Sequence, residues 1–153
     1  MADVRPAAPG DLADVRRLLR EYASALPFAL DFQDFDDEVA TLPGRYAPPG
    51  GALLVARVDG GVVGCVGVRR LDDETCEMKR LYVSETARGS GLGRVLEEAS
   101  IDEARRLGYR RMRLDTVPGM ETAQSLYARL GFREIEPYTR NPVPGARFLE
   151  LEL

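Results

Sequence analysis

The sequence has no histidine, no tryptophan and only 2 cysteines among its 153 residues. Without histidine there is no His general base, no Ser–His or Cys–His nucleophile pair, and little scope for zinc chemistry. No window approaches the ~18 apolar residues of a membrane span, and residues 1–6 lack the apolar core of a signal peptide. These absences predict a cytoplasmic protein that needs neither a metal nor a membrane.

An excess of positive charge is also missing, since the formal net charge is −4. This balance argues against a partner nucleic acid held on a broad basic face. A local basic patch remains compatible with it, and Arg88 with Arg94 could form one.

The composition is that of an ordinary globular chain, with 44% apolar and 30% charged residues. Its length suits one domain over residues 1–153 with a substantial core. Cys65 and Cys76 lie in apolar, strand-like runs. This context favours two buried core residues over a disulfide or a reactive thiol.

Hydrophobic periodicity predicts elements in the order βααβββαβαββ. Expected strands are 2–6, 52–58, 62–70, 75–83, 111–116, 132–136 and 147–153, and expected helices are 12–26 (with Asp11 as N-cap), 36–42, 92–107 and 118–130. This order predicts an α+β (mixed α/β) domain with a central mixed, mostly antiparallel sheet flanked by helices. The last strand alternates well enough either to close this sheet or to pair across a dimer, so a monomer and a homodimer both stay open.

The most informative segment is the glycine-rich run between the strand at 75–83 and the helix at 92–107, namely Arg88-Gly89-Ser90-Gly91-Leu92-Gly93. Glycines allow a backbone to approach a ligand closely, and the unpaired N–H groups of a helix start attract an anion. The segment therefore predicts a phosphate-bearing ligand. No lysine follows the glycines as a P-loop requires, and the third glycine of a Rossmann fingerprint is absent.

A third pattern fits. Arg88-x-x-Gly91-x-Gly93, after Leu81-Tyr82-Val83, resembles the acyl-CoA pyrophosphate loop of the GCN5-related N-acetyltransferase (GNAT) superfamily. The resemblance extends to the order of elements over the whole chain. It also includes a form of the family's fourth strand, Glu77-Met78-Lys79-Arg80-Leu81-Tyr82-Val83, and a downstream landmark, Ala123-x-x-Leu126-Tyr127-x-x-Leu130-Gly131-Phe132.

The resemblance implies transfer of an acetyl group from acetyl-CoA, a cosubstrate, to a primary amine of a small molecule. The amine would attack the thioester directly in a ternary complex. Acetylation of a protein or peptide amine is an alternative. A second alternative, from another class, is a non-catalytic acyl-CoA-binding module that regulates a partner.

The resemblance also implies where the donor binds. The pyrophosphate would contact the N–H groups of residues 89–94 (Gly89, Ser90, Gly91, Leu92, Gly93 and Arg94), with Arg88 and Arg94 adding charge. The fourth and fifth strands would splay apart, so that the pantetheine arm pairs with the free edge at Leu81, Tyr82 and Val83. The N–H of Val83 would polarise the thioester carbonyl.

Tyr127 is the implied general acid, because a phenol stays protonated at neutral pH and can donate to a thiolate. The alternative is a core tyrosine on the apolar stripe of its helix. Glu77 is the implied base, directly or through a water, and the alternative is a strand carboxylate paired with Lys or Arg. Strict alternation predicts Glu77, Lys79, Leu81 and Val83 on one face of their strand and Cys76, Met78, Arg80 and Tyr82 on the other.

One position departs from the family pattern, because Met120 stands where many relatives carry an asparagine that contacts the pantetheine arm. The acceptor site is expected from the first helices and from the loops at 27–50 and 137–145. Tyr138, Asn141 and the acidic run 31–38 are candidates there. That run either attracts a cationic amine or is a solvated helix start.

Overall fold

The computed structural model describes residues 3–26, 34–118 and 121–153. The elements are β1 (Asp3–Pro6), α1 (Leu12–Ala25), α2 (Phe35–Ala40), β2 (Ala52–Val58), β3 (Gly61–Arg70), β4 (Thr75–Val83), α3 (Leu92–Arg106), β5 (Arg111–Thr116), α4 (Glu121–Leu130), β6 (Arg133–Ile135) and β7 (Arg147–Glu152). The predicted element order and the α+β class are confirmed. Asp31 of the acidic run and Met120 lie outside the described residues.

The strands form one sheet in the order β1-β2-β3-β4-β5-β7-β6. The pair β4–β5 is parallel, and the other neighbouring pairs are antiparallel. β7 lies between β5 and β6, so both of its edges are hydrogen-bonded within the chain. Within this chain the last strand therefore closes its own sheet, as one of the two predicted alternatives has it.

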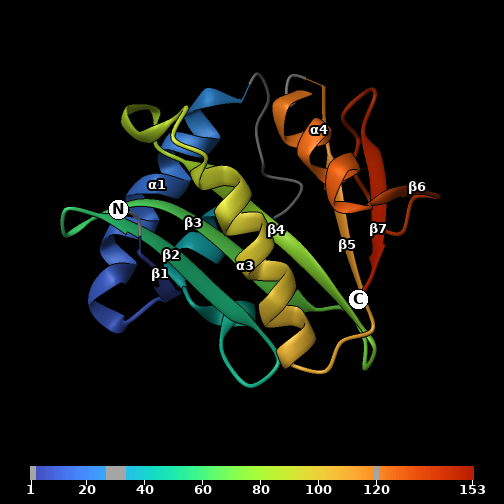
Figure 1. The fold of residues 1–153 in the computed structure, drawn as a ribbon, viewed down its shortest axis with the longest axis horizontal. Coiled ribbons are helices and arrows are strands. Elements are labelled where there is room, and N and C mark those ends of the chain that lie inside the picture. Colours follow the sequence, from blue (N-terminus) through green and yellow to red (C-terminus); the bar gives the residue numbers. More distant parts are fainter. Residues whose placement is uncertain (1–2, 27–33, 119–120) are drawn as a thin grey trace.

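β4 and β5 separate soon after they meet, as predicted. Their ladder joins Thr75, Cys76 and Glu77 to residues 111–113, whereas β4 continues to Val83. Figure 1 shows the two strands diverging from the end of the sheet near the C-terminal label. The unpaired part of β4 is thus one wall of an opening in the middle of the sheet.

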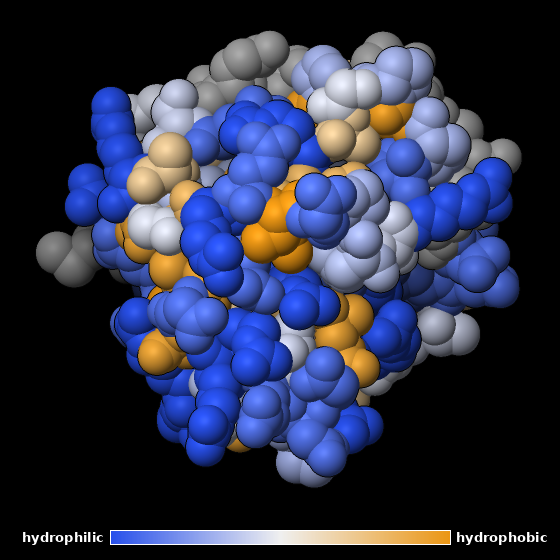
Figure 2. Space-filling view, turned by 90° about the vertical axis from the view of Figure 1, so that its right-hand side faces the viewer, coloured by the Kyte–Doolittle hydropathy of each residue, from blue (hydrophilic) through white to orange (hydrophobic). Residues whose placement is uncertain are grey.

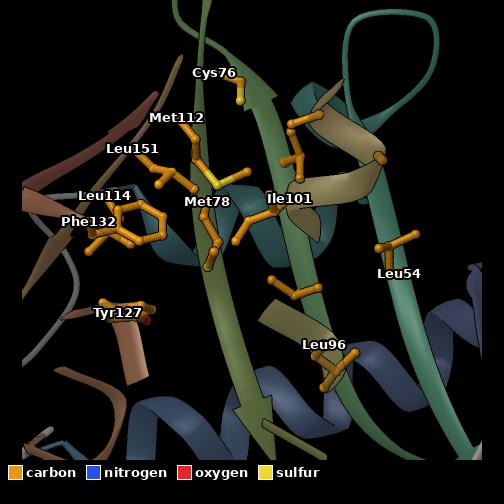
Figure 3. Packing of buried hydrophobic residues seen from close by; sticks show 14 of the residues in the cluster. Leu54, Cys76, Met78, Leu96, Ile101, Met112, Leu114, Tyr127, Phe132 and Leu151 are labelled. Atoms are coloured by element: carbon orange, nitrogen blue, oxygen red, sulfur yellow. The ribbon is translucent and has the colours of Figure 1, made fainter. Parts of the chain in front are cut away.

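Two apolar clusters hold the helices to the two faces of the sheet. On one face, α3 and α4 pack against the sheet through Leu92, Leu96, Ile101, Ala104 and Tyr127. On the other face, α1 and α2 contribute Val15, Leu18, Leu19, Phe35 and Val39. Figure 3 shows the first cluster, with Met78 of β4 and Met112 of β5 near its centre. The opening between β4 and β5 therefore has a helical layer on either side.

A β-bulge in β4 overturns the strict alternation predicted for this strand. Between the pairs Cys65–Tyr82 and Gly67–Lys79, β4 contains one more residue than β3, and Arg80 has φ 61°. Beyond the bulge, Leu81 packs with the α3 cluster and Tyr82 with the α1–α2 cluster. The α1–α2 face of β4 therefore carries four polar side chains, those of Glu77, Lys79, Arg80 and Tyr82.

Asp11 does not cap α1 as predicted, because no N–H of that helix binds its side chain. Its carboxylate instead accepts a hydrogen bond from the Ala8 N–H at 2.8 Å and pairs with Arg5 and Arg57 at 3.3 and 2.9 Å. The prediction failed because a short 3-10 turn precedes the helix and gives Asp11 a helical backbone. Asp11 thus ties the start of α1 to β1 and β2.

The surface on the β6 side of the molecule is mostly hydrophilic. Figure 2 shows this face with small, separate groups of hydrophobic residues.

Cys65 and Cys76 are free thiols and fully buried, which confirms their assignment to the core. None of the helices in the described part of the chain is long and apolar enough to cross a membrane.

Candidate functional site

The glycine-rich segment forms an open turn at the start of α3. Gly89 and Gly91 both have φ 82°, which explains glycine at these two positions. Gly93 has no such φ, and a Cβ there would meet no atom within 4 Å. Neither strain nor packing within the chain accounts for Gly93. The vacant space beside its backbone suits a ligand that approaches the main chain closely.

The N–H groups of this turn are available to a ligand. Within the described residues, no N–H of residues 89–94 donates to another backbone carbonyl, and the first donor of the helix is Val95, which binds the Gly91 carbonyl at 3.2 Å. These unpaired donors lie at the positive end of a helix that runs to Arg106. These are the donors that the predicted anion site would use.

The two arginines of the predicted basic patch make contacts with different parts of the chain. Arg88 is exposed, donates to the Val83 carbonyl at 3.2 Å and stacks over the Tyr82 ring at 5.4 Å. It therefore bridges the glycine turn and the free end of β4. Arg94 pairs on the surface of α3 with Glu98 at 2.9 Å.

Tyr127 lies buried beside the opening between β4 and β5. Its ring packs edge-on against Phe132, with centroids 5.6 Å apart, and Figure 3 shows both rings together. Burial raises the pKa of its phenol above the ordinary value, and the charges of Glu97 and Asp115 act in the same direction. Glu97 belongs to α3 and Asp115 to β5. The phenol therefore lies close enough to both elements for their carboxyl groups to affect it electrostatically. The phenol carries its proton at any neutral pH.

Glu77 is held between two partners on the α1–α2 face of the sheet. Its carboxylate binds the Arg69 guanidinium at 2.7 Å through one oxygen and accepts the Tyr138 hydroxyl at 2.6 Å through the other. The side chain is 1% exposed. These contacts match the alternative of a paired strand carboxylate, and they join it to the loop before β7.

A second series of polar contacts crosses the opening two residues further along β4. The Lys79 ammonium pairs with Asp115 of β5 at 3.1 Å, and both side chains are buried. The other oxygen of Asp115 accepts the Asn141 amide at 3.0 Å. Tyr138 and Asn141 thus anchor the loop before β7 over the opening, where the sequence predicted an acceptor wall.

A third polar group forms around Arg80, at the bulge. Its guanidinium makes two hydrogen bonds to Glu38 of α2, at 2.7 and 3.1 Å, and the Tyr46 hydroxyl donates to the same carboxylate at 3.0 Å. Burial alone would raise the pKa of Glu38, but Arg80 and Tyr46 outweigh it, so the pKa is lowered. The acidic run is therefore partly neutralised from within the chain.

Beside this group lies a cavity of about 450 Å³, whose polar lining residues include Asp34, Asp37, Glu38, Arg45, Tyr46 and Arg69. Arg69 connects it to Glu77 and thus to β4. Asp34 and Asp37 of the acidic run line this cavity. They are the residues through which the run could face an acceptor, as the sequence predicted.

The sequence did not single out Lys79, Arg80 or Asp115 as site residues. The sequence did contain a signal for them, because a strand with three charged residues in four positions, Glu77 to Arg80, cannot be buried without partners.

No group of three or more potential metal ligands occurs within residues 3–26, 34–118 and 121–153.

These features, a helix start with unpaired N–H groups next to a splayed pair of strands, agree with a comparison against protein families. Residues 12–132 match the model of the Acetyltransferase (GNAT) family. The chain belongs to the GNAT acetyltransferase family. The match includes β4, the glycine turn and Tyr127, and it confirms the predicted family.

Relatives of this GNAT chain are also named acetyltransferases. An uncharacterized N-acetyltransferase from Schizosaccharomyces pombe is 42% identical over 147 residues, covering 95% of this chain and 90% of that protein. An IAA acetyltransferase from Azospirillum brasilense is 40% identical over 110 residues, covering 70% of this chain and 71% of that protein. The chain is thus an enzyme of the N-acetyltransferase class.

Solved structures show the same fold at low identity. A GNAT-family acetyltransferase from Staphylococcus aureus Mu50 superposes with a TM-score of 0.81 at 19% identity, over 99% of both chains. One from Elizabethkingia anophelis, solved with acetyl-CoA bound, superposes with a TM-score of 0.68 at 22% identity, over 99% of this chain and 98% of that chain.

Proposed function

We propose that this GNAT enzyme transfers the acetyl group of acetyl-CoA to a primary amine of a small molecule, in a ternary complex. The observation that carries the proposal is the glycine turn. Its unpaired N–H groups lie at the start of α3, and the preceding strand ends in an unpaired edge toward β5. This combination suits a ligand with an anionic end and an extended polar arm.

Donor binding would use the N–H groups of residues 89–94 for the pyrophosphate. Arg88, exposed beside the turn, would add a positive charge, as would Arg94 after release of Glu98. The arm would lie along residues 81–83, and the Val83 N–H would polarise the thioester carbonyl. The space beside Gly93 supports this assignment, since nothing in the chain fills it.

In the transfer step, the amine nitrogen attacks the thioester carbonyl, and the C–S bond breaks as the C–N bond forms. The departing sulfur becomes a thiolate, and Tyr127 is the proposed group that donates to it. Because burial raises the pKa of this phenol, a hydrogen bond to the developing thiolate is favoured over early loss of the proton. A primary ammonium must give up one proton to a base before the attack, and its nitrogen gives up a second as the amide forms and keeps one N–H.

Glu77 is the proposed base, and its contacts define a sharp test of that role. Both carboxylate oxygens are hydrogen-bonded, so proton transfer would have to pass through Tyr138 or a water. If Glu77 is the base, Glu77→Gln removes the acidic limb of the pH–rate profile. If Glu77 only positions Arg69 and Tyr138, the variant keeps the wild-type profile and unfolds at a lower temperature.

A small acceptor is supported by the site's dimensions. The cavity of about 450 Å³ beside α2 has the size of a small-molecule pocket, and Asp34 and Asp37 line it. Relatives whose names specify a small product include the N-acetylaspartate synthetase of Rattus norvegicus, 34% identical over 99 residues and covering 64% of this chain and 33% of that protein. A protein amine would need a longer open groove.

The proposal is tested by measuring CoA thiol release from acetyl-CoA with a panel of amino acids, polyamines and lysine peptides. Release that depends on one class of small amine supports the proposal. Release with peptides alone would assign a protein acceptor. Tight acetyl-CoA binding without release for any amine would favour the regulatory acyl-CoA-binding module.

A further inference from the structure

Glu97 is a buried carboxyl group to which the proposed reaction assigns no role. It lies in α3, its residue exposure is 0%, and within the described residues neither carboxyl oxygen has a hydrogen-bond partner. The nearby Ser100 hydroxyl donates to the Glu97 backbone carbonyl rather than to the carboxyl group. A buried carboxyl without a partner costs about 1–3 kcal/mol or more, so its presence calls for an explanation.

Packing does not supply that explanation. Glu97 precedes Ile101 by one helical turn, and Ile101 and Ala104 pack in the apolar cluster beneath α3. A leucine would suit such a surface better than a carboxyl group. Glu97 is thus a polar interruption of an apolar helix face, in the half of α3 nearer the glycine turn.

Two observations relate Glu97 to the two ends of the proposed donor site. It is about six residues, or about 9 Å along the helix axis, beyond Gly91 at the anion-binding turn. On its other side, its charge acts on the Tyr127 phenol, which is proposed to face the thiol. A ligand that joins a pyrophosphate at the turn to a thiol near Tyr127 would extend past this part of α3.

The pantetheine arm of CoA has two secondary amides, and each N–H needs an acceptor when the arm leaves water. A carboxyl group offers two acceptor oxygens whether or not it is protonated. On the basis of the acetyl-CoA function proposed above, we propose that the Glu97 carboxyl accepts a hydrogen bond from a pantetheine amide N–H. Glu97 is then a cofactor-binding residue on α3, in addition to the glycine turn and β4.

The test compares Glu97→Leu, which removes the acceptor, with Glu97→Gln, which keeps an acceptor oxygen of similar size. Calorimetry measures binding of CoA and of 3′-phospho-ADP, the nucleotide half of CoA, which lacks the arm. We expect Glu97→Leu to weaken CoA binding about fivefold to tenfold, the range of a single net hydrogen bond. Glu97→Gln should stay within about twofold of the wild type, and 3′-phospho-ADP should bind all three proteins equally.

Two results would overturn the inference. One is CoA affinity in Glu97→Leu that equals the wild-type value, as expected if a water satisfies the carboxyl group. The other is an equal loss for CoA and 3′-phospho-ADP, which would indicate a structural role. By contrast, a wild-type protein that binds neither ligand would contradict the proposed function itself.

A second measurement does not depend on the folding of Glu97→Leu. Infrared difference spectra of the wild-type protein, with Glu97→Gln as the blank, isolate the carboxyl stretch of Glu97. Addition of CoA should shift this band, and 3′-phospho-ADP should leave it in place. A band that CoA does not move would contradict the proposed hydrogen bond.

Discussion

At the scale of single residues, Tyr127 and Glu97 are two buried groups that hold protons and lie within electrostatic reach of each other. Burial raises the pKa of both, that of Glu97 to about 8, where the charge of Glu98 also contributes. Each group is therefore protonated over much of the neutral range. The site keeps hydrogen-bond donors in place without a histidine.

Replacing Tyr127 by phenylalanine should lower turnover about 10-fold to 100-fold, the lower range for loss of one proton-donating side chain. The ring would keep its packing against Phe132, so acetyl-CoA affinity and the unfolding temperature should change little. Steady-state kinetics and calorimetry check this. Unchanged turnover would remove Tyr127 from the reaction.

Glu97 should make the protein less stable as the pH rises. The carboxyl group binds its proton more tightly in the folded state, with a pKa of about 8, than at the ordinary value of 4.5. Between these values, unfolding releases a proton, so the free energy of unfolding falls with increasing pH and levels off above about 8. Below pH 4.5 the group is neutral in both states and contributes no slope.

The measurement is the thermal unfolding midpoint from pH 5 to 9. Wild type should lose stability over this range relative to Glu97→Gln, which cannot ionise. Asp102→Asn, at an exposed carboxylate of the same helix, is the matched control and should follow wild type. Parallel curves for wild type and Glu97→Gln would contradict a raised pKa.

At the scale of elements, the bulge in β4 is the feature that organises the site. It turns Arg80 to the same side as Glu77 and Lys79, so that one strand presents three charges to the α1–α2 layer. The pattern of alternating residues could not reveal this, because an extra residue changes the phase of a strand without altering its composition. The strand's bounds, by contrast, followed directly from its apolar and β-branched residues.

Substitutions at the bulge should reverse the usual ranking of glycine and alanine in strands. Arg80→Ala removes the partner of Glu38 and should cost about 3–5 kcal/mol. Arg80→Gly loses the same pair but relieves the φ of 61°, so it should be more stable than Arg80→Ala by about 1 kcal/mol.

Urea unfolding of the two variants measures this difference. Lys79→Gly and Lys79→Ala, one position earlier and without a positive φ, should rank in the usual order, with alanine more stable. The same ranking at both positions would argue against strain at Arg80.

At the scale of the whole molecule, CoA binding should stabilise the folded domain. With CoA at about 100 times its dissociation constant, binding adds about 2.7 kcal/mol to the free energy of unfolding. This raises the unfolding midpoint by about 5–10 °C for a domain of this size. Gly93→Ala is the matched variant. It should be slightly more stable without ligand, because alanine favours helices, and should show a smaller rise with CoA.

Thermal scans with and without CoA decide this prediction. A full CoA-induced rise in Gly93→Ala would show that the space beside residue 93 is not used by the ligand.

The order of elements and the glycine turn at the start of α3 were predictable, because the glycine spacing and the hydrophobic periodicity are local signals. The polar contacts around the proposed acceptor site were not. They join residues far apart in the chain, as in Glu77 with Tyr138 and Asp115 with Asn141. Which loop side chain meets which strand carboxylate depends on the splay and the bulge, and neither leaves a local pattern.

The insertion of β7 between β5 and β6 has a consequence for synthesis on the ribosome. β5 emerges well before β7, and its ladder with β4 joins only three residue pairs. Until β7 arrives, a nascent chain exposes one full edge of β5, a template on which another unfinished chain could pair. Chaperone demand should therefore be greatest while the segment between these strands is being translated, and it should end when Arg147–Glu152 fills the gap.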